Sequence, residues 1–103
     1  MSQATAIDHI AIYVSDMDNA KKFFIEGLGL TIHGDYGNEF FMEVGAQLLA
    51  IFKGRNRTQT FNHIALRVND FTGVKRRLER LGYNVYKQDM VDGPDGIRVQ
   101  LVQ

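Results

Sequence analysis

The chain has 103 residues, enough for one compact domain with a hydrophobic core. Its 12 Lys and Arg balance its 12 Asp and Glu, which argues against a basic nucleic-acid-binding face and against an acidic solvating tail. Hydrophobic residues make up 45 % of the chain, which excludes intrinsic disorder, and the absence of cysteine excludes disulfides and thiolate metal sites.

Residues 7–14 alternate between two kinds of side chain, which is typical of a strand with two different faces. The face predicted to pack under a helix consists of Ile10, Ile12 and Val14. The opposite face consists of Ile7, His9, Ala11 and Tyr13. Asp16 then follows as the predicted N-cap of a helix, and Gly29 is placed to end that helix in a left-handed conformation. The apolar stripe of this helix consists of Met17, Ala20, Phe24 and Leu28.

Three further strands are predicted near residues 30–36, 39–45 and 47–53, separated by glycines. Phe40, Phe41 and Met42 are consecutive, so at least one of them must face away from the helix. Residues 53–60 form a polar linker without an apolar side chain.

The linker leads into a second copy of the same unit. Residues 63–70 repeat residues 9–16 at an offset of 54, and five of the eight pairs are identical. Asp70 and Gly82 are the predicted cap and stop of a second helix. Its apolar stripe consists of Phe71, Val74, Leu78 and Leu81. The basic residues outside the two stripes are predicted to be solvated, and they are Lys21, Lys22, Lys75, Arg76, Arg77 and Arg80.

The second copy ends with a predicted strand near 84–89, a turn at 92–96 and a strand at 97–102, one strand fewer than the first copy. We therefore predict an α+β fold of two tandem βαβββ modules, the second shortened by one strand. Both modules belong to one domain spanning residues 1–103. Module 1 covers about 5–53, the linker about 53–60 and module 2 about 61–103.

Three motifs carry a resemblance to a known family. They are Asp8-His9-Ile10-Ala11, its copy Asn62-His63-Ile64-Ala65, and the closing Pro94-Asp95-Gly96-Ile97-Arg98-Val99-Gln100-Leu101. Together they resemble the vicinal oxygen chelate superfamily, which includes glyoxalase I, bleomycin-resistance proteins, fosfomycin-resistance thiol transferases and extradiol dioxygenases. The resemblance implies a cup-like curved mixed sheet with helices on its outer face.

In this family the first and fourth strands of each module supply metal ligands, and the matching positions here are His9, Ala50, His63 and Gln100. Alanine cannot ligate, so the resemblance implies a divalent ion (Ni, Co, Mn, Zn or Fe) held by His9, His63 and Gln100. Gln100 replaces the usual carboxylate, which removes a negative charge and a general base. If residues 97–102 were instead the third strand of module 2, Gln100 would be no ligand. The histidines also have a purely structural reading, as hydrogen-bonded strand residues, and His33 is expected at the surface.

Alternation along the strands predicts which other side chains line the cup. These residues are Tyr13, Leu48, Ala50, Phe52, Arg67 and Arg98. The two arginines suit a carboxylate or phosphate ligand. The alternative is that they are exposed and paired with Glu39, Glu43 or Asp95.

Three functions remain open from the sequence. The first is a divalent-metal-dependent enzyme acting on a small vicinal-oxygen substrate, as a lyase or isomerase, thiol transferase or dioxygenase. The second is a metal-free small-molecule-binding protein that uses the same cup, and the third is an association module. We expect a cytoplasmic homodimer without nucleic-acid or membrane partners, because no apolar run reaches the ~20 residues of a membrane helix and the start lacks signal-peptide features. The two modules can pair within one chain or swap between two.

Overall fold

The computed structural model describes residue 3 and residues 7–54 and 63–103. The linker prediction for residues 53–60 therefore lies mostly outside the described residues. Among the described helices, none is long and apolar enough to cross a membrane.

The first module is a four-stranded sheet in the order β1-β4-β3-β2. β1 runs parallel to β4, and β3 is antiparallel to both β4 and β2. The strands are β1 (His9–Val14), β2 (Thr31–Asp35), β3 (Glu39–Val44) and β4 (Gln47–Lys53). Between β1 and β2 lie the helix α1 (Met17–Lys21) and the π-helix η1 (Lys22–Gly27). The Asp16 carboxylate accepts a hydrogen bond from the Asn19 backbone N–H, which confirms the predicted N-cap.

The second module repeats this arrangement with the order β5-β8-β7-β6, and β5 is parallel to β8. The strands are β5 (Ile64–Arg67), β6 (Val85–Tyr86), β7 (Met90–Asp92) and β8 (Arg98–Val102). The other elements are helix α2 (Phe71–Arg80) and two short 3-10 turns, η2 (Lys87–Asp89) and η3 (Pro94–Gly96). Asp70 caps α2 through the Gly73 N–H, and Gly29 and Gly82 adopt the predicted left-handed conformation after the helices.

The fold class of two βαβββ modules is confirmed, but the prediction of a shortened second module is wrong. The segment predicted as one strand at 84–89 contains β6 and a turn, and a further strand, β7, follows it and pairs antiparallel with β6. Gln88 and Asp89 form this turn with φ angles of 63° and 59°. Neither residue is a glycine or proline, so Asp89, a residue type that tolerates the left-handed conformation, is the turn signal at this point.

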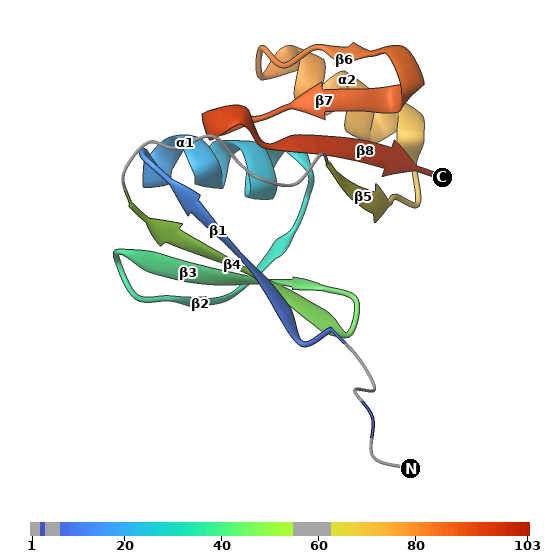
Figure 1. The fold of residues 1–103 in the computed structure, drawn as a ribbon. Helices are drawn as coiled ribbons and strands as arrows, with labels where there is room; N and C mark the ends of the chain where they lie inside the picture. The colour runs from blue at the N-terminus through green and yellow to red at the C-terminus, as the bar shows by residue number, and fades with distance from the viewer. Residues whose placement is uncertain (1–2, 4–6, 55–62) are drawn as a thin grey trace.

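The two modules pack against each other through their helices, and their buried residues form one hydrophobic cluster. Phe23 on η1 is fully buried, with its ring 4.9 Å from the ring of Tyr83 in module 2. The Ser15 N–H and hydroxyl both donate to the Asp95 carboxylate, at 3.0 and 2.9 Å. Figure 1 shows the two sheets as separate layers with α1 between them and α2 behind β7 and β8.

Two basic residues, Lys22 and Arg77, take part in this packing, contrary to the prediction that all of them are solvated. The Lys22 Nζ lies 5.6 Å from the centre of the Tyr83 ring. Arg77 is partly buried, and its Nε donates to the carbonyl oxygen of Gly27 at 3.2 Å. Because η1 ends beside α2, this guanidinium reaches a carbonyl at the end of the other helix. Residues from two distant segments make the contact, so no local pattern predicts it.

Candidate functional site

Each sheet has one face turned away from the helices, which we call the open face. On β1, Ile12 and Val14 are buried while His9, Ala11 and Tyr13 are exposed, which confirms the predicted alternation. The strand register pairs His9 with Leu48, Ala11 with Ala50 and Tyr13 with Phe52. Residues paired in this way share a face. The open face of the first sheet therefore carries His9, Tyr13, Leu48, Ala50 and Phe52, all of which the sequence selected.

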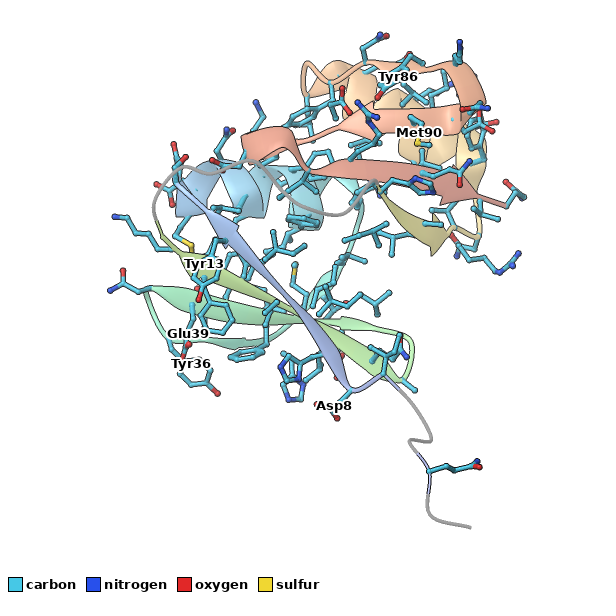
Figure 2. All side chains as sticks on the ribbon, in the orientation of Figure 1. Asp8, Tyr13, Tyr36, Glu39, Tyr86 and Met90 are labelled. Atoms are coloured by element: carbon cyan, nitrogen blue, oxygen red, sulfur yellow. The ribbon has the colours of Figure 1, made fainter. Side chains whose placement is uncertain are left out.

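A row of four aromatic rings crosses one end of this face. The Tyr13 and Phe52 ring centroids are 5.9 Å apart, Phe52 and Phe41 are 6.1 Å apart, and Phe41 and Tyr36 are 6.0 Å apart. Figure 2 shows Tyr13, Glu39 and Tyr36 gathered at this end, with Asp8 at the opposite end of the sheet. Ala50 pairs with Phe41 and is fully covered although it lies on the open face. The four rings thus make this end of the face apolar.

The prediction that at least one residue of the Phe40-Phe41-Met42 run faces away from the helix is confirmed. Phe40 and Met42 are fully buried in the core, and Phe41 lies on the open face. The role of Tyr36 was missed because it lies after β2, in a turn without alternation. Its ring is also packed over Gly34, where a Cβ atom would lie 2.8 Å from the Tyr36 hydroxyl.

The opposite end of the first open face is polar. The His9 Nδ1 lies 2.9 Å from the Asp8 carboxylate, and both side chains are substantially exposed. A carboxylate on one imidazole nitrogen orients the ring and leaves Nε2 to act as a ligand. His33 lies at the surface as predicted, with its Nδ1 3.3 Å from the Glu43 carboxylate.

The open face of the second sheet carries Gln100 between Ala65 on β5 and Met90 on β7. Ala50 occupies the same place in the first sheet, between Ala11 and Phe41. This register confirms that residues 98–102 form the fourth strand of module 2, so the alternative placement as a third strand is wrong. The Gln100 Nε2 donates to the Gln88 carbonyl at 3.1 Å, which leaves the side-chain oxygen as its acceptor or ligand atom. His63 directly precedes β5.

The two predicted arginines have partners on the second open face. The Arg98 Nε donates to the Asp92 carboxylate at 3.0 Å, and the Tyr86 hydroxyl donates to the same oxygen at 2.8 Å. These hydrogen bonds to Asp92 raise the pKa of both Tyr86 and Arg98. Arg67 donates to the Gln103 carbonyl at 3.0 Å.

Both arginines were expected either to bind ligand or to pair with Glu39, Glu43 or Asp95. The expected partners of Arg98 are wrong, because its cross-strand neighbour in the β7–β8 register is Asp92. Asp95 instead bonds to Ser15. The missed residues Asp92 and Tyr86 became recognisable only once β7 was known to be a strand.

The structure distributes the three predicted metal ligands over two sheets. His9 begins β1, whereas His63 and Gln100 belong to the second module, and Figure 1 shows the start of β1 well away from β5 and β8. Over residues 7–54 and 63–103, no group of three His, Cys, Asp or Glu residues could hold a metal ion. The donor atoms suit a divalent ion, but the described part of one chain does not bring them together.

Comparison with known proteins agrees with this architecture. The glutathione transferase FosA of Serratia marcescens is 26 % identical, over 93 % of this chain and 79 % of its own length. A mutant of the fosfomycin resistance protein FosX from Listeria monocytogenes, complexed with Mn(II) and 1S,2S-dihydroxypropylphosphonic acid, superimposes with a TM-score of 0.83, at 18 % identity, over 97 % of this chain and 90 % of its own. Lactoylglutathione lyase from Agrobacterium tumefaciens gives a TM-score of 0.70 at 22 % identity, over 96 % and 93 %.

The structural likenesses, all under 25 % identity, support the fold. A family model decides membership, because it matches residues 6–101, almost the whole chain. The resemblance seen in the sequence motifs is thereby confirmed. The chain belongs to the Glyoxalase/Bleomycin resistance protein/Dioxygenase superfamily.

Proposed function

We propose that the chain binds a small anionic molecule with vicinal oxygens on a divalent metal ion, held by His9 of one copy and by His63 and Gln100 of a second copy. The observation that carries this proposal is the matched register of the two modules. Ala50 and Gln100 lie at equivalent positions on the fourth strands of the two modules. The neighbouring strand begins at His9 in module 1 and directly after His63 in module 2. The relatives FosX and FosA add support, since the FosX structure is a complex with Mn(II).

The chemistry of the donors favours an anionic ligand. Two neutral imidazoles and one neutral amide leave the charge of a divalent ion uncompensated. The Asp8 carboxylate lies behind His9, where it orients the ring and makes its nitrogen a stronger donor. A bound ion would supply Lewis-acid polarisation of the substrate oxygens. A substrate carrying phosphonate or carboxylate oxygens would provide the negative charge that Gln100 lacks.

Completion of the site by a second copy explains the separation of the donors. Both open faces are exposed in the single chain, and β1 and β5 are the edge strands of their sheets. An edge strand presents unpaired backbone groups that another chain can cover. In a two-fold dimer the open face of module 1 would meet that of the partner's module 2, which forms two equivalent cups.

Among the reactions open to this family, thiol transfer agrees best with the residues present. None of the three donors is a carboxylate, so the ligand set contains no base that could remove a proton from a substrate carbon. A thiol that adds to an activated substrate needs no such base on the ligand set. The similarity to the glutathione transferase FosA points the same way.

The test begins with bound metal in untagged protein, measured by elemental mass spectrometry, followed by titration of the metal-free protein with Ni, Co, Mn, Zn and Fe(II). His9→Ala and His63→Ala should each abolish binding, and the control His33→Ala should leave it intact. Gln100→Glu should tighten binding, because it adds an anionic donor. Equal losses in all three histidine variants would contradict the assignment.

A mixing experiment separates a shared site from a site within one chain. Neither His9→Ala nor His63→Ala binds metal alone in this proposal, but a mixed dimer contains one site with both histidines intact. Unfolding and refolding a one-to-one mixture should therefore restore roughly a quarter of the sites. A site within one chain would recover none of them.

Metal-free binding of an aromatic molecule is the second candidate, and the aromatic row on the first open face supports it. Tyr13 is 44 % exposed and Tyr36 67 % exposed, so their rings offer stacking surface. Indole, titrated by calorimetry into metal-free protein, would bind wild type and His9→Ala alike and lose affinity in Phe52→Ala. Binding that requires metal would favour the first proposal.

A further inference from the structure

A cleft of about 540 Å³ lies between the two modules. Of the residues assigned to the open faces, Arg67 alone lines it. Its volume falls within the ~300–1,000 Å³ typical of small-molecule pockets. The apolar side chains that line it come from both modules, and they are Leu28, Leu30, Val44, Leu66, Val68 and Val74.

These apolar side chains are covered to different degrees. Leu28 and Val74 are nearly buried, at 7 % and 6 % exposed, so they form a floor. Leu30, Val44, Leu66 and Val68 are half-buried and form walls that keep part of their surface in water. Covering such a surface with an apolar group is favourable, by about 25 cal/mol per Å². The cleft therefore favours a ligand with an apolar portion.

Two guanidinium groups, Arg67 and Arg77, lie at the rim of the cleft. The Arg77 Nε donates to the Gly27 carbonyl, and an Arg67 terminal nitrogen donates to the Gln103 carbonyl. Arg77 thus uses part of its five donors on a neutral amide oxygen, and Arg67 uses part of its own on the main-chain oxygen of residue 103. Within the described ranges, neither arginine forms an ion pair with an Asp or Glu side chain.

The remaining charge at the rim is the carboxylate of Asp70, which accepts the Gly73 N–H at 3.0 Å as the helix cap. Among the side chains that line the cleft, two are cationic and one is anionic. Gly29 leaves space beside the Arg77 guanidinium, since a Cβ atom at residue 29 would lie 2.7 Å from the Arg77 Nη2. A ligand with an anionic head would find guanidinium donors that no described Asp or Glu side chain occupies.

We propose that this cleft binds a small amphiphilic anion, with its carboxylate or phosphate head on Arg67 and Arg77 and its apolar chain against the leucine and valine walls. A planar guanidinium binds both types of head through paired hydrogen bonds. A smaller hollow of about 170 Å³ shares Val44, Leu66 and Arg67 with the cleft and extends toward Leu48 and Ala65, which gives the chain further room. None of the proposed metal ligands lines the cleft, so binding there does not require the metal. The smaller hollow reaches the open faces, at Leu48 beside His9 and at Ala65 beside Gln100.

Binding is tested by calorimetry and amide NMR on the full chain, with octanoate, octyl phosphate and octylammonium as probes. We expect the two anions to bind and the cation of the same chain length not to bind. Comparing octanoate with octyl phosphate shows which head the rim prefers. Inorganic phosphate, which lacks a chain, should bind at least tenfold more weakly than octyl phosphate.

Variants test the roles of the two arginines. Arg67→Gln and Arg77→Gln should each weaken anion binding about tenfold or more. Arg80→Gln is the matched control, because Arg80 is an exposed arginine of the same helix outside the cleft. Arg77 also joins the two modules, so weaker binding by Arg77→Gln supports the proposal only if this variant keeps the wild-type amide spectrum. Arg67 is exposed, so weaker binding by Arg67→Gln is by itself a test of the proposal.

The location is tested by the same NMR spectra. Octanoate should shift the amides of Leu30, Val44, Leu66 and Val74 and raise the melting temperature, because it contacts both modules. Shifts confined to the open face around Tyr13 and Ala50 would overturn the proposal. Equal weakening by Arg80→Gln, or equal binding of octylammonium, would also overturn it.

Discussion

Gly93 has no space for a side chain, because a Cβ atom at this position would lie 2.6 Å from the ring of Phe23. Phe23 belongs to module 1 and is fully buried, whereas Gly93 precedes η3 in module 2. The backbone at Gly93 is extended, with φ −94°, so alanine would be tolerated there by the backbone itself. Gly93→Ala therefore tests the packing between modules without adding backbone strain.

The expected magnitude follows from overpacking in a closed core. Forcing one extra methyl group against a buried ring costs about 1–3 kcal/mol of unfolding free energy. Phe23→Leu, which leaves a small cavity, should cost about 1–2 kcal/mol alone. In the double variant the smaller leucine makes room for the alanine methyl, so its loss should fall short of the sum by about 1 kcal/mol or more.

Urea unfolding at one fixed protein concentration measures these free energies, since a dimer would make stability depend on concentration. Phe40→Leu serves as the matched control. Phe40 is equally buried but lies on β3, and none of its atoms is among the three nearest to a Cβ at Gly93. Its combination with Gly93→Ala should be additive. If Phe23→Leu is also additive with Gly93→Ala, the close contact between Phe23 and Gly93 does not exist in solution and the reasoning is refuted.

Three further predictions concern single contacts. Asp70→Ala should lower the free energy of unfolding by about 1 kcal/mol in urea titrations, because it removes the α2 cap, and an unchanged midpoint would contradict the cap. The hydrogen bond from Lys21 holds the pKa of Asp35 below its usual value, so this pair stabilises the fold above about pH 4 and the contribution is lost as pH falls through the lowered pKa. Lys21→Met should flatten that part of the stability–pH curve, and identical curves would disprove the coupling. Asp92→Asn should lower the raised pKa of Tyr86, as followed by ultraviolet absorbance at alkaline pH, and no change would exclude the hydrogen bond as its cause.

Much of each module could be predicted from local patterns. The alternation in residues 9–14 separates a buried face from an open face because side chains of a strand point to opposite sides. Asp16 and Asp70 mark helix starts because a short carboxylate can satisfy free backbone N–H groups. The repeat then identified the second module and, through the family resemblance, its superfamily.

Local patterns were insufficient where non-local contacts decide the structure. Residues 84–89 were predicted as one strand, but a turn at Gln88 and Asp89 ends β6 and leads into a separate strand, β7. Only the resulting register brought Asp92 beside Arg98 and Tyr86. The π-helical turn at Lys22–Gly27 likewise accompanies the burial of both Phe23 and Phe24, where a regular helical stripe predicts only Phe24.

The module, its two strand faces and the residues that each face carries are all encoded locally, because they follow from chain periodicity and from the capping of helix ends. The arrangement of the two modules is not encoded in this way, since Phe23, Tyr83 and the Ser15–Asp95 contact join them through the helix side. This arrangement leaves His9 on one sheet and Gln100 on the other. Strand periodicity specifies which face a side chain occupies, but only packing between distant segments specifies which faces meet.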